Sequence, residues 1–440
     1  MTFTPYLLAV SLAFGGPGGP GDPAPVSSAG WLRALPDGPT KRQFVLDCTG
    51  CHQFDAQVTT PNGSARTREQ WIEAVKRMLT YGGATTSFPV IGAGRAPEAT
   101  AEWLTSALAR SGAPSSPRFD APTVAAEVRE YLMPVAQDLP HDVAVEPNGS
   151  IVITGMFSHT MYRLDPASGT MTAVPLPVEK GGPRAVEVDR EGNWWVLMGA
   201  AQLLGRYAPS DGKWTTWPLA TYPHSVALDS SGGAWYNGHF TRDPEQLTRI
   251  DPATGGGRTF SLPLHPTMAK VPGGPVPYEI RTGPDGRIWG SELQGNRIYA
   301  LTPSTGAVEV YPLPREKSGP RRLDVGPDGT VWVPGYADNS LLRFDPATRV
   351  FTTYPLPVPD ALPYVARVDP SGRRVWIGTG AADALIAFDI ASGAFTIYPL
   401  PTHGAMVRHM AFDPGNGDLW LAYGASPGRI PARVARVRVR

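Results

Sequence analysis

The sequence predicts two domains, a small all-α domain followed by an all-β seven-bladed β-propeller. Three observations lead to this prediction. From residue 126 onward the chain repeats a unit of short β segments, and the units start 40 to 54 residues apart. Residues 31–112 instead contain two amphipathic helical stretches. The 49 glycines and 48 prolines follow no three-residue period, so they indicate many tight turns between short strands.

Each repeat begins with a proline before an apolar stretch and continues through a turn of the Pro-Asp-Gly type. Three repeats end in Tyr-Pro-Leu-Pro, at 311–314, 354–357 and 398–401. A period of 40 to 45 residues with about four short strands per unit is typical of a β-propeller, because one unit alone cannot bury both faces of its sheet. The units start at Pro140, Pro183, Pro223, Pro277, Pro320 and Pro363, and a seventh, degenerate unit starts near Val407.

The last unit, 407–440, ends without a Tyr-Pro-Leu-Pro segment. A comparable segment, Tyr131-Leu-Met-Pro134, lies before the first unit. We therefore expect residues 126–134 to form the outer strand of the last blade. Such a strand closes the ring and removes an open sheet edge.

The first 30 residues predict a secretory signal peptide. An apolar run covers residues 7–14, and small residues at 27–30 suit cleavage near Ala29, although no Lys or Arg precedes the run. The sequence then predicts the helical domain at 31–112, a Pro- and Ser-rich linker at 113–125 and the propeller at 126–440. We expect a periplasmic or otherwise exported protein with no transmembrane span after the signal region.

Residues 48–52 read Cys-Thr-Gly-Cys-His and contain both cysteines of the chain. This C-x-x-C-H pattern is the attachment signature of a c-type haem. Cys48 and Cys51 can bond to the two vinyl groups of one haem, and the adjacent His52 can then reach the iron. A chance pentapeptide and a thioredoxin-like C-x-x-C are the alternatives, but the second needs a βαβ context that this region lacks. We expect one covalent haem c.

Met78 is the candidate sixth ligand of the haem iron, because residues 53–130 contain no histidine and no other methionine. Thr67 and Gln70 predict a capping box at a helix start, and Trp71, Val75 and Met78 then share one helical face. The same spacing also fits a methionine that only packs in the core. His/Met ligation is typical of electron-transfer cytochromes, whereas a five-coordinate haem would favour ligand binding.

Residues 31–112, with this motif and a second amphipathic stretch at 98–110, are similar to class I cytochrome c. The resemblance implies one-electron transfer. Residues 125–440 resemble the propeller of the streptogramin B lyase (virginiamycin B lyase) family, most specifically in the run GPDGRIWGSELQGNRI at 283–298. That run implies the propeller fold and does not by itself imply lyase activity.

In the lyase family, the resemblance implies a base near the α-proton of a cyclic ester and a metal that polarises the carbonyl. His141 and His224 match the family's Pro-His element, and Glu292 is the one acid at the register of a metal-binding glutamate. Leu139 and Tyr222 stand where the other metal-binding glutamate belongs, so the glutamate pair is not reproduced. His141, His224 and Glu292 are the catalytic candidates, and the missing pair argues against lyase activity.

The residue after the first position of each repeat lies where an inner strand begins, near the central channel. These seven residues are polar, aromatic or basic, and we call this set the propeller mouth. Arginine suits carboxylate or phosphate recognition, so the set favours a small anionic or phenolic ligand. A solvated rim that binds nothing is the alternative. The mouth residues are His141, Arg184, His224, Tyr278, Arg321, Tyr364 and Arg408.

The charge balance excludes one class of partner. The 39 Lys and Arg residues equal the 39 Asp and Glu residues, which argues against nucleic-acid binding. We expect an exported c-type cytochrome whose propeller binds a redox partner protein or a small-molecule substrate at its mouth. The alternatives are a lyase with a haem appendage and a non-catalytic module in which haem reports redox state. We find no second cofactor motif, so the sequence predicts no particular catalysed reaction.

Overall fold

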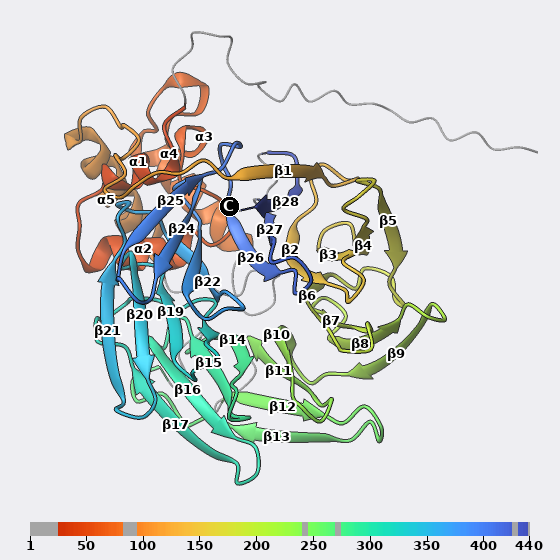
Figure 1. Ribbon diagram of the computed structural model, residues 1–440. Helices are drawn as coiled ribbons and strands as arrows, with labels where there is room; N and C mark the ends of the chain where they lie inside the picture. The colour runs from red at the N-terminus through yellow and green to blue at the C-terminus, as the bar shows by residue number, and fades with distance from the viewer. Residues whose placement is uncertain (1–24, 82–94, 240–244, 269–273, 425–429, 439–440) are drawn as a thin grey trace, which may run out of the picture.

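The computed structural model describes residues 25–81, 95–239, 245–268, 274–424 and 430–438. Figure 1 shows helices beside a ring of seven four-stranded sheets, so the predicted seven-bladed β-propeller is confirmed. The helices are α1 (Ser28–Arg33), α2 (Pro39–Cys48), α3 (Ala56–Thr59), α4 (Arg68–Tyr81) and α5 (Pro97–Arg110), with a 3-10 turn at Pro61–Gly63.

Helix α4 begins with the predicted capping box. The Thr67 amide donates to Gln70 Oε1 at 2.9 Å, and the Gln70 amide donates to Thr67 Oγ1 at 3.3 Å. These two bonds satisfy amides that the first helical turn leaves without a partner. Trp71 and Val75 are buried and Met78 is half-buried, so the predicted apolar face points into the helical unit.

Each of the first six blades runs in chain order from an inner to an outer antiparallel strand. Blade 1 has β2 (Pro140–Val145), β3 (Ile151–Gly155), β4 (Thr160–Leu164) and β5 (Met171–Pro175); blade 2 has β6 (Pro183–Val188), β7 (Trp194–Met198), β8 (Leu203–Ala208) and β9 (Lys213–Pro218); blade 3 has β10 (Tyr222–Leu228), β11 (Ala234–His239), β12 (Gln246–Ile250) and β13 (Gly257–Ser261). Blade 4 has β14 (Pro277–Thr282), β15 (Ile288–Glu292), β16 (Arg297–Thr302) and β17 (Ala307–Pro312); blade 5 has β18 (Asp324–Val325), β19 (Val331–Gly335), β20 (Ser340–Asp345) and β21 (Val350–Pro355); blade 6 has β22 (Pro363–Val368), β23 (Arg374–Thr379), β24 (Ala384–Asp389) and β25 (Phe395–Pro399).

The seventh blade joins the two ends of the propeller sequence. Its strands are β26 (Val407–Phe412), β27 (Leu419–Tyr423), β28 (Arg433–Arg438) and, outermost, β1 (Glu127–Leu132). Strand β1 pairs antiparallel with β28, with Tyr131 opposite Val434. The Glu130 carboxylate accepts hydrogen bonds from Thr402 Oγ1 at 2.8 Å, from Arg433 Nη1 at 2.7 Å and from the Tyr423 hydroxyl. The ring is therefore closed by a segment from before the first repeat (Figure 1).

Neighbouring blades are held together by the large apolar residues of the repeat. Trp289 on β15 is 1% exposed and packs with Leu323 and Val333 of the next blade. Its ring centroid lies 5.9 Å from that of Phe344. The preceding turn has Gly286 at φ +78°, a conformation that the repeat's Pro-Asp-Gly pattern provides for. Each blade thus covers the sheet face that its neighbour cannot bury alone.

The expected linker, 113–125, lies against blade 6. The Asp120 amide donates to the Pro357 carbonyl and the Val124 amide to the Ile397 carbonyl, both at 2.9 Å, and the Ile397 amide donates back to Pro122. The segment continues the sheet beyond β25 with a parallel bridge between Thr123 and Ile397. It therefore follows the propeller on its way from α5 to β1.

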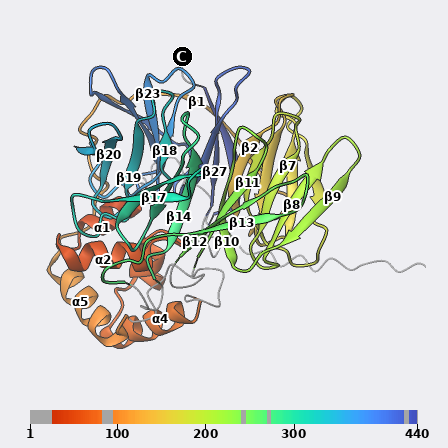
Figure 2. The ribbon, with the colours of Figure 1, turned by 90° about the horizontal axis from the view of Figure 1, so that it is seen from below.

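The helices lie together on one face of the ring, as Figure 2 shows. One apolar cluster contains Leu32, Phe44 and Leu46 from the helical unit together with Tyr336 and Met406 from the propeller. The helical unit begins earlier than residue 31, because Ser28 is 1% exposed in α1 and its Oγ accepts from the Phe54 amide. In the part of the chain that the structure describes, we find no helix of the length and apolarity that a membrane span requires.

We predict that replacing Glu130 by alanine lowers the free energy of unfolding by about 2–3 kcal/mol, because it leaves the partly buried Arg433 and the fully buried Tyr423 without their shared acceptor. Denaturant unfolding followed by tryptophan fluorescence measures the change. Glu127→Ala is the matched control on the same strand, since its ion pair with Arg438 is half exposed and 3.5 Å long. Equal losses in both variants would contradict a closure that depends on Glu130.

Candidate functional site

The 48–52 turn starts where α2 ends. Thr49 is the C-cap of α2, and its amide donates to the Val45 carbonyl at 3.3 Å. Cys48 and Cys51 are unlinked thiols on either side of this cap. Burial raises the pKa of Cys48 to about 12 and that of Cys51 to about 11, so both are neutral thiols near pH 7. A c-type haem is attached through two cysteine thiols three positions apart, and Cys48 and Cys51 have this spacing.

His52 is held in one tautomer. Its side chain is buried, and Nδ1 donates to the Gln53 carbonyl at 2.8 Å. A histidine that donates from Nδ1 to a backbone carbonyl carries its lone pair on Nε2, and this is how metal-bound histidines are commonly oriented. The geometry of His52 therefore fits an iron ligand.

Aromatic side chains surround the turn on its helical side. Phe44 lies 5.3 Å from both Phe54 and Trp103, and Phe54 stacks on Trp71 with centroids 6.3 Å apart. Cys48 packs against the same cluster. An apolar environment of this kind suits a porphyrin, so the residues present fit a haem. The assignment of Met78 as sixth ligand stays a prediction, because residues 82–94, which follow α4, lie outside the described structure.

The seven predicted mouth residues do gather around the centre of the ring. They are between 0% and 4% exposed, so they do not form a solvated rim, and ligand binding at the mouth stays a prediction. In six blades the pairing of the inner and second strands shifts register at this point, as between Pro277 and Ile280. Such bulges redirect side chains, which explains why the residue after the first position points to the axis. In blade 5 the inner strand is reduced to β18, and Arg321 precedes it.

Four mouth residues form one polar and aromatic group with Tyr336, which we call the mouth cluster. Arg321 Nη1 donates to the Tyr278 hydroxyl at 2.6 Å, and that hydroxyl lies 2.6 Å from the hydroxyl of Tyr364. The Arg321 guanidinium carbon is 4.0 Å from the ring centroid of Tyr336 and 4.5 Å from that of Tyr364. Arg408 Nη1 lies 3.3 Å from the Tyr364 hydroxyl.

The mouth cluster contains two buried positive charges. Within the described residues, no carboxylate lies at ion-pair distance from Arg321 or Arg408, and Nε and Nη2 of Arg321 have no hydrogen-bond acceptor. Burial alone would raise the pKa of Tyr364, but the guanidiniums of Arg321 and Arg408 lower it to about 8. Burial raises the pKa of the neighbouring Tyr278 instead. Tyr364 is therefore the group that supplies negative charge here as the pH rises.

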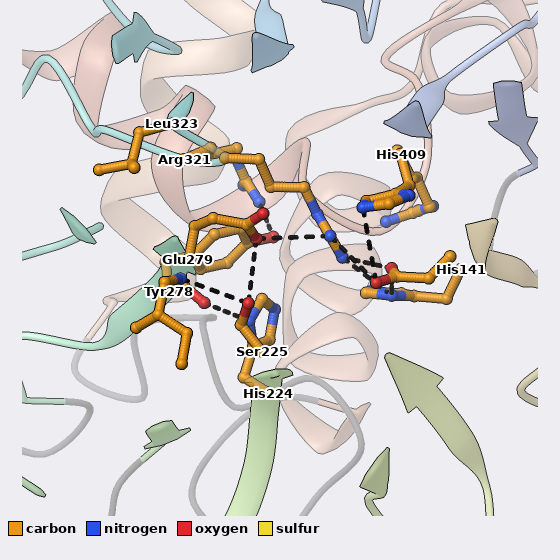
Figure 3. A network of polar contacts seen from close by, with 12 residues as sticks. His141, His224, Ser225, Tyr278, Glu279, Arg321, Leu323 and His409 are labelled. Atoms are coloured by element: carbon orange, nitrogen blue, oxygen red, sulfur yellow. Dashed lines mark hydrogen bonds and ion pairs between the residues drawn. The ribbon is translucent and has the colours of Figure 1, made fainter. Parts of the chain in front are cut away.

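His141 and His224 lie next to each other in the mouth with ring centroids 5.9 Å apart, and the His224 ring centroid lies 4.2 Å from that of Tyr278. His141 Nδ1 lies 2.8 Å from both Asp142 Oδ1 and the Arg184 carbonyl, and burial lowers its pKa to about 3. His224 Nδ1 donates to the Tyr278 carbonyl. These two catalytic candidates are thus brought together as buried imidazoles (Figure 3).

Glu292 is held in a buried ion pair. Its side chain is fully buried, and Arg297 binds it through Nε at 2.6 Å and Nη2 at 3.0 Å. Burial raises the pKa of Glu292, while Arg297 acts in the opposite direction. Among the described residues, no group of three or more His, Cys, Asp or Glu side chains is placed to hold a metal ion.

A buried ion network beneath the mouth was missed by the sequence reasoning. Arg322 binds Asp142 at 2.6 Å and Glu279 at 3.4 Å, and Glu279 also binds Arg367 at 3.0 Å. His409 Nε2 lies 2.9 Å from Arg367 Nη2. Figure 3 labels two of these residues, Glu279 on β14 and His409 on β26, which reach the network from different blades. The sequence does contain a signal for this network, one position further along each repeat. The residues that directly follow a mouth residue include Asp142, Glu279, Arg322 and His409.

The 48–52 turn lies on the mouth cluster. Arg408 donates from Nη1 to the Gly50 carbonyl at 3.1 Å and from Nη2 to the Cys51 carbonyl at 2.6 Å. The Tyr336 hydroxyl donates to the Thr49 carbonyl at 2.9 Å. The 48–52 turn and the propeller mouth therefore form one site, although they lie far apart in the sequence.

The fold and this site define a helical unit with a C-x-x-C-H turn docked on a seven-bladed propeller. Residues 265–430 match the virginiamycin B lyase family model. A streptogramin B lyase structure is 20% identical with a TM-score of 0.62, covering 72% of this chain and 98% of its own. Virginiamycin B lyase from Staphylococcus aureus gives the same identity, TM-score and coverage of this chain, and its own chain is covered completely.

A second kind of propeller protein is also similar. A chain of Kuenenia stuttgartiensis hydrazine synthase is 14% identical with a TM-score of 0.55, covering 70% of this chain and 97% of its own. The search of curated proteins finds no match. At these identities the structural likenesses show the propeller fold, which is virginiamycin B lyase-like.

We predict that one tyrosine ionises with a pKa of about 8 and that Tyr364→Phe removes this step. The tyrosinate difference absorbance, recorded from about pH 7 to pH 10, measures it. Folding lowers the pKa of Tyr364, so ionisation of its hydroxyl stabilises the folded protein. This contribution to the free energy of unfolding is complete above the pKa of an unfolded tyrosine and is lost as the pH falls through about 8. The advantage of wild type over Tyr364→Phe in unfolding free energy therefore grows by about 2–3 kcal/mol over that range.

Tyr354→Phe is the control for this titration, since Tyr354 lies on the outer strand β21, away from the mouth. It should retain the step near pH 8. A wild-type protein whose tyrosines all ionise at or above their ordinary pKa would contradict the charge balance of the mouth cluster.

Proposed function

We propose that this protein is an exported c-type cytochrome fused to a virginiamycin B lyase-like propeller, and that it transfers single electrons through one covalent haem. The observation that carries the proposal is the 48–52 turn, with two unlinked thiols and a tautomer-fixed histidine beside an aromatic cluster. When bound, the haem supplies the one-electron chemistry, and the protein supplies its ligands, burial and orientation.

Four side chains would hold the haem. Cys48 and Cys51 would form its two thioethers, His52 Nε2 would bind the iron on one side, and the Met78 sulfur on the other. The hydrogen bond from His52 Nδ1 to the Gln53 carbonyl keeps the imidazole turned toward the iron. The aromatic cluster around Phe44 and Phe54 would exclude water from the porphyrin.

Export follows from the haem proposal together with the apolar run at 7–14. That run lies outside the described residues. The buried positions of Ser28 and Ala29 in α1 argue that cleavage falls before them, since Ala29 donates to the Ala381 carbonyl at 2.9 Å. We therefore propose a periplasmic or otherwise exported protein whose mature chain retains α1.

The partner of the propeller is a redox partner protein or a small-molecule substrate. The helical unit contacts the mouth at Tyr278, Tyr364 and Arg408, and the His224 ring packs on Tyr278 beneath this contact, with centroids 4.2 Å apart. The mouth residues are 0% to 4% exposed, so a small ligand would reach them only after side chains of the mouth or the 48–52 turn move aside.

Streptogramin lyase activity is the second candidate, and the family match over residues 265–430 favours it. Two observations count against it. Arg297 binds the carboxylate of Glu292, and the helical unit covers the mouth that a large cyclic peptide would have to enter. A non-catalytic module in which the haem reports redox state is the third candidate, and a measured turnover would exclude it.

We predict that the chain, made in a host with a c-type haem maturation system, carries one haem that stays bound after denaturation. The oxidised spectrum should be low-spin with the weak far-red band of methionine ligation. Met78→Ala should remove that band and keep the covalent haem, whereas Met171→Ala, a half-buried methionine of the propeller, should change neither. The double variant Cys48→Ala and Cys51→Ala should lose the covalent haem.

A wild-type protein that leaves this host without haem would overturn the proposed function. A covalent but high-spin haem in the wild type would overturn the Met78 assignment and the electron-transfer role with it.

We also predict that the haem-loaded protein leaves the cyclic peptide quinupristin intact. An elimination that opens the ring keeps the mass, so chromatography against a streptogramin B lyase digest is the appropriate measurement. Ring opening by the wild type that is lost in His141→Ala or His224→Ala would favour the second candidate over the first.

A further inference from the structure

The propeller holds the 48–52 turn through its backbone. The Thr49 carbonyl accepts from Tyr336, and the Gly50 and Cys51 carbonyls accept from Arg408. One residue beyond the turn, Gln53 Nε2 donates to the Gly380 carbonyl at 2.9 Å. These bonds come from blades 5, 6 and 7, so the turn is fixed to three blades at once.

The second arginine of the mouth cluster is also close to the turn. A Cβ atom on Gly50 would lie 2.8 Å from Arg321 Nη2, a distance that a real Cβ does not tolerate. Glycine at this position of the C-x-x-C-H turn therefore allows the guanidinium to approach the backbone directly. Arg321 is 0% and Arg408 2% exposed. Neither has a carboxylate at ion-pair distance among the described residues.

Two such charges matter because the turn carries the ligand of the proposed haem iron. Cys51, whose carbonyl Arg408 binds, directly precedes His52. A ferric haem has one more positive charge than a ferrous haem, and buried cations nearby therefore favour the ferrous form. Water cannot screen these guanidiniums, and no carboxylate of the described residues neutralises them.

We propose that Arg408 and Arg321 are positioning residues of the haem site that raise its reduction potential, so that the propeller sets the redox poise of the helical unit. The inference rests on the proposed covalent haem. It assigns the propeller a role that needs no substrate at its mouth. It also explains why two unneutralised charges are buried where the two parts of the molecule meet.

The test is a potentiometric titration of the haem-loaded full chain near pH 7, where Tyr364 is protonated. Arg408→Gln should lower the midpoint so that the ferrous to ferric ratio at a fixed ambient potential falls about tenfold, which corresponds to 59 mV for one electron. Arg408→Lys keeps the charge and loses the two-pronged hydrogen bond, so it should recover most of the midpoint. Arg349→Gln, which removes an exposed arginine paired with Glu309, should leave the midpoint unchanged.

Arg321→Gln gives an independent result if Arg408→Gln fails to fold or to take up haem, and it should lower the midpoint in the same direction. An unchanged midpoint in Arg321→Gln or Arg408→Gln, with haem covalently bound, would overturn the inference and leave the proposed function intact. A drop in Arg408→Lys as large as that in Arg408→Gln would also overturn it, because the effect would then come from packing. A wild type without haem would instead overturn the proposed function itself.

Discussion

The arrangement of the molecule depends on the contact between the Arg408 guanidinium and the carbonyls of Gly50 and Cys51. This contact joins the first functional motif of the chain to its last blade, 358 and 357 residues apart. It fixes the backbone of the turn at the two residues that directly precede His52. A planar guanidinium with parallel donors suits two successive carbonyls, and a lysine would not reproduce that geometry.

The buried charges along the propeller axis form two layers, and the layers differ in whether each charge has a counter-charge. In the lower layer three arginines and three carboxylates pair across blades: Arg322, Arg367 and Arg281 with Asp142, Glu279 and Glu187. In the upper layer Arg321 and Arg408 face tyrosines and backbone carbonyls. Burying a charge without a counter-charge costs stability, so the upper layer contributes less to the stability of the fold than the lower layer does.

Much of the fold could be predicted from the repeats, because each proline, turn and tryptophan recurs in the same order. The gathering of the seven mouth residues followed from the same register, since equivalent positions of propeller blades meet at the axis. The residues after Tyr278 and Arg321 turn inward as well, Glu279 beside the register shift of blade 4 and Arg322 just before the short strand β18, and they belong to a second layer that single-position reasoning overlooked. The pairing of Glu292 with Arg297 also depends on a strand register that the sequence pattern does not specify.

The docking of the helical unit could not be predicted, because no periodicity relates Gly50 to Arg321 or Thr49 to Tyr336. The measurement that tests this account most directly is a crystal structure of the haem-loaded, matured protein. We predict thioether bonds at Cys48 and Cys51, His52 on the iron, and Arg408 bound to the carbonyls of Gly50 and Cys51. Free thiols, or a helical unit that lies away from the propeller mouth, would contradict it.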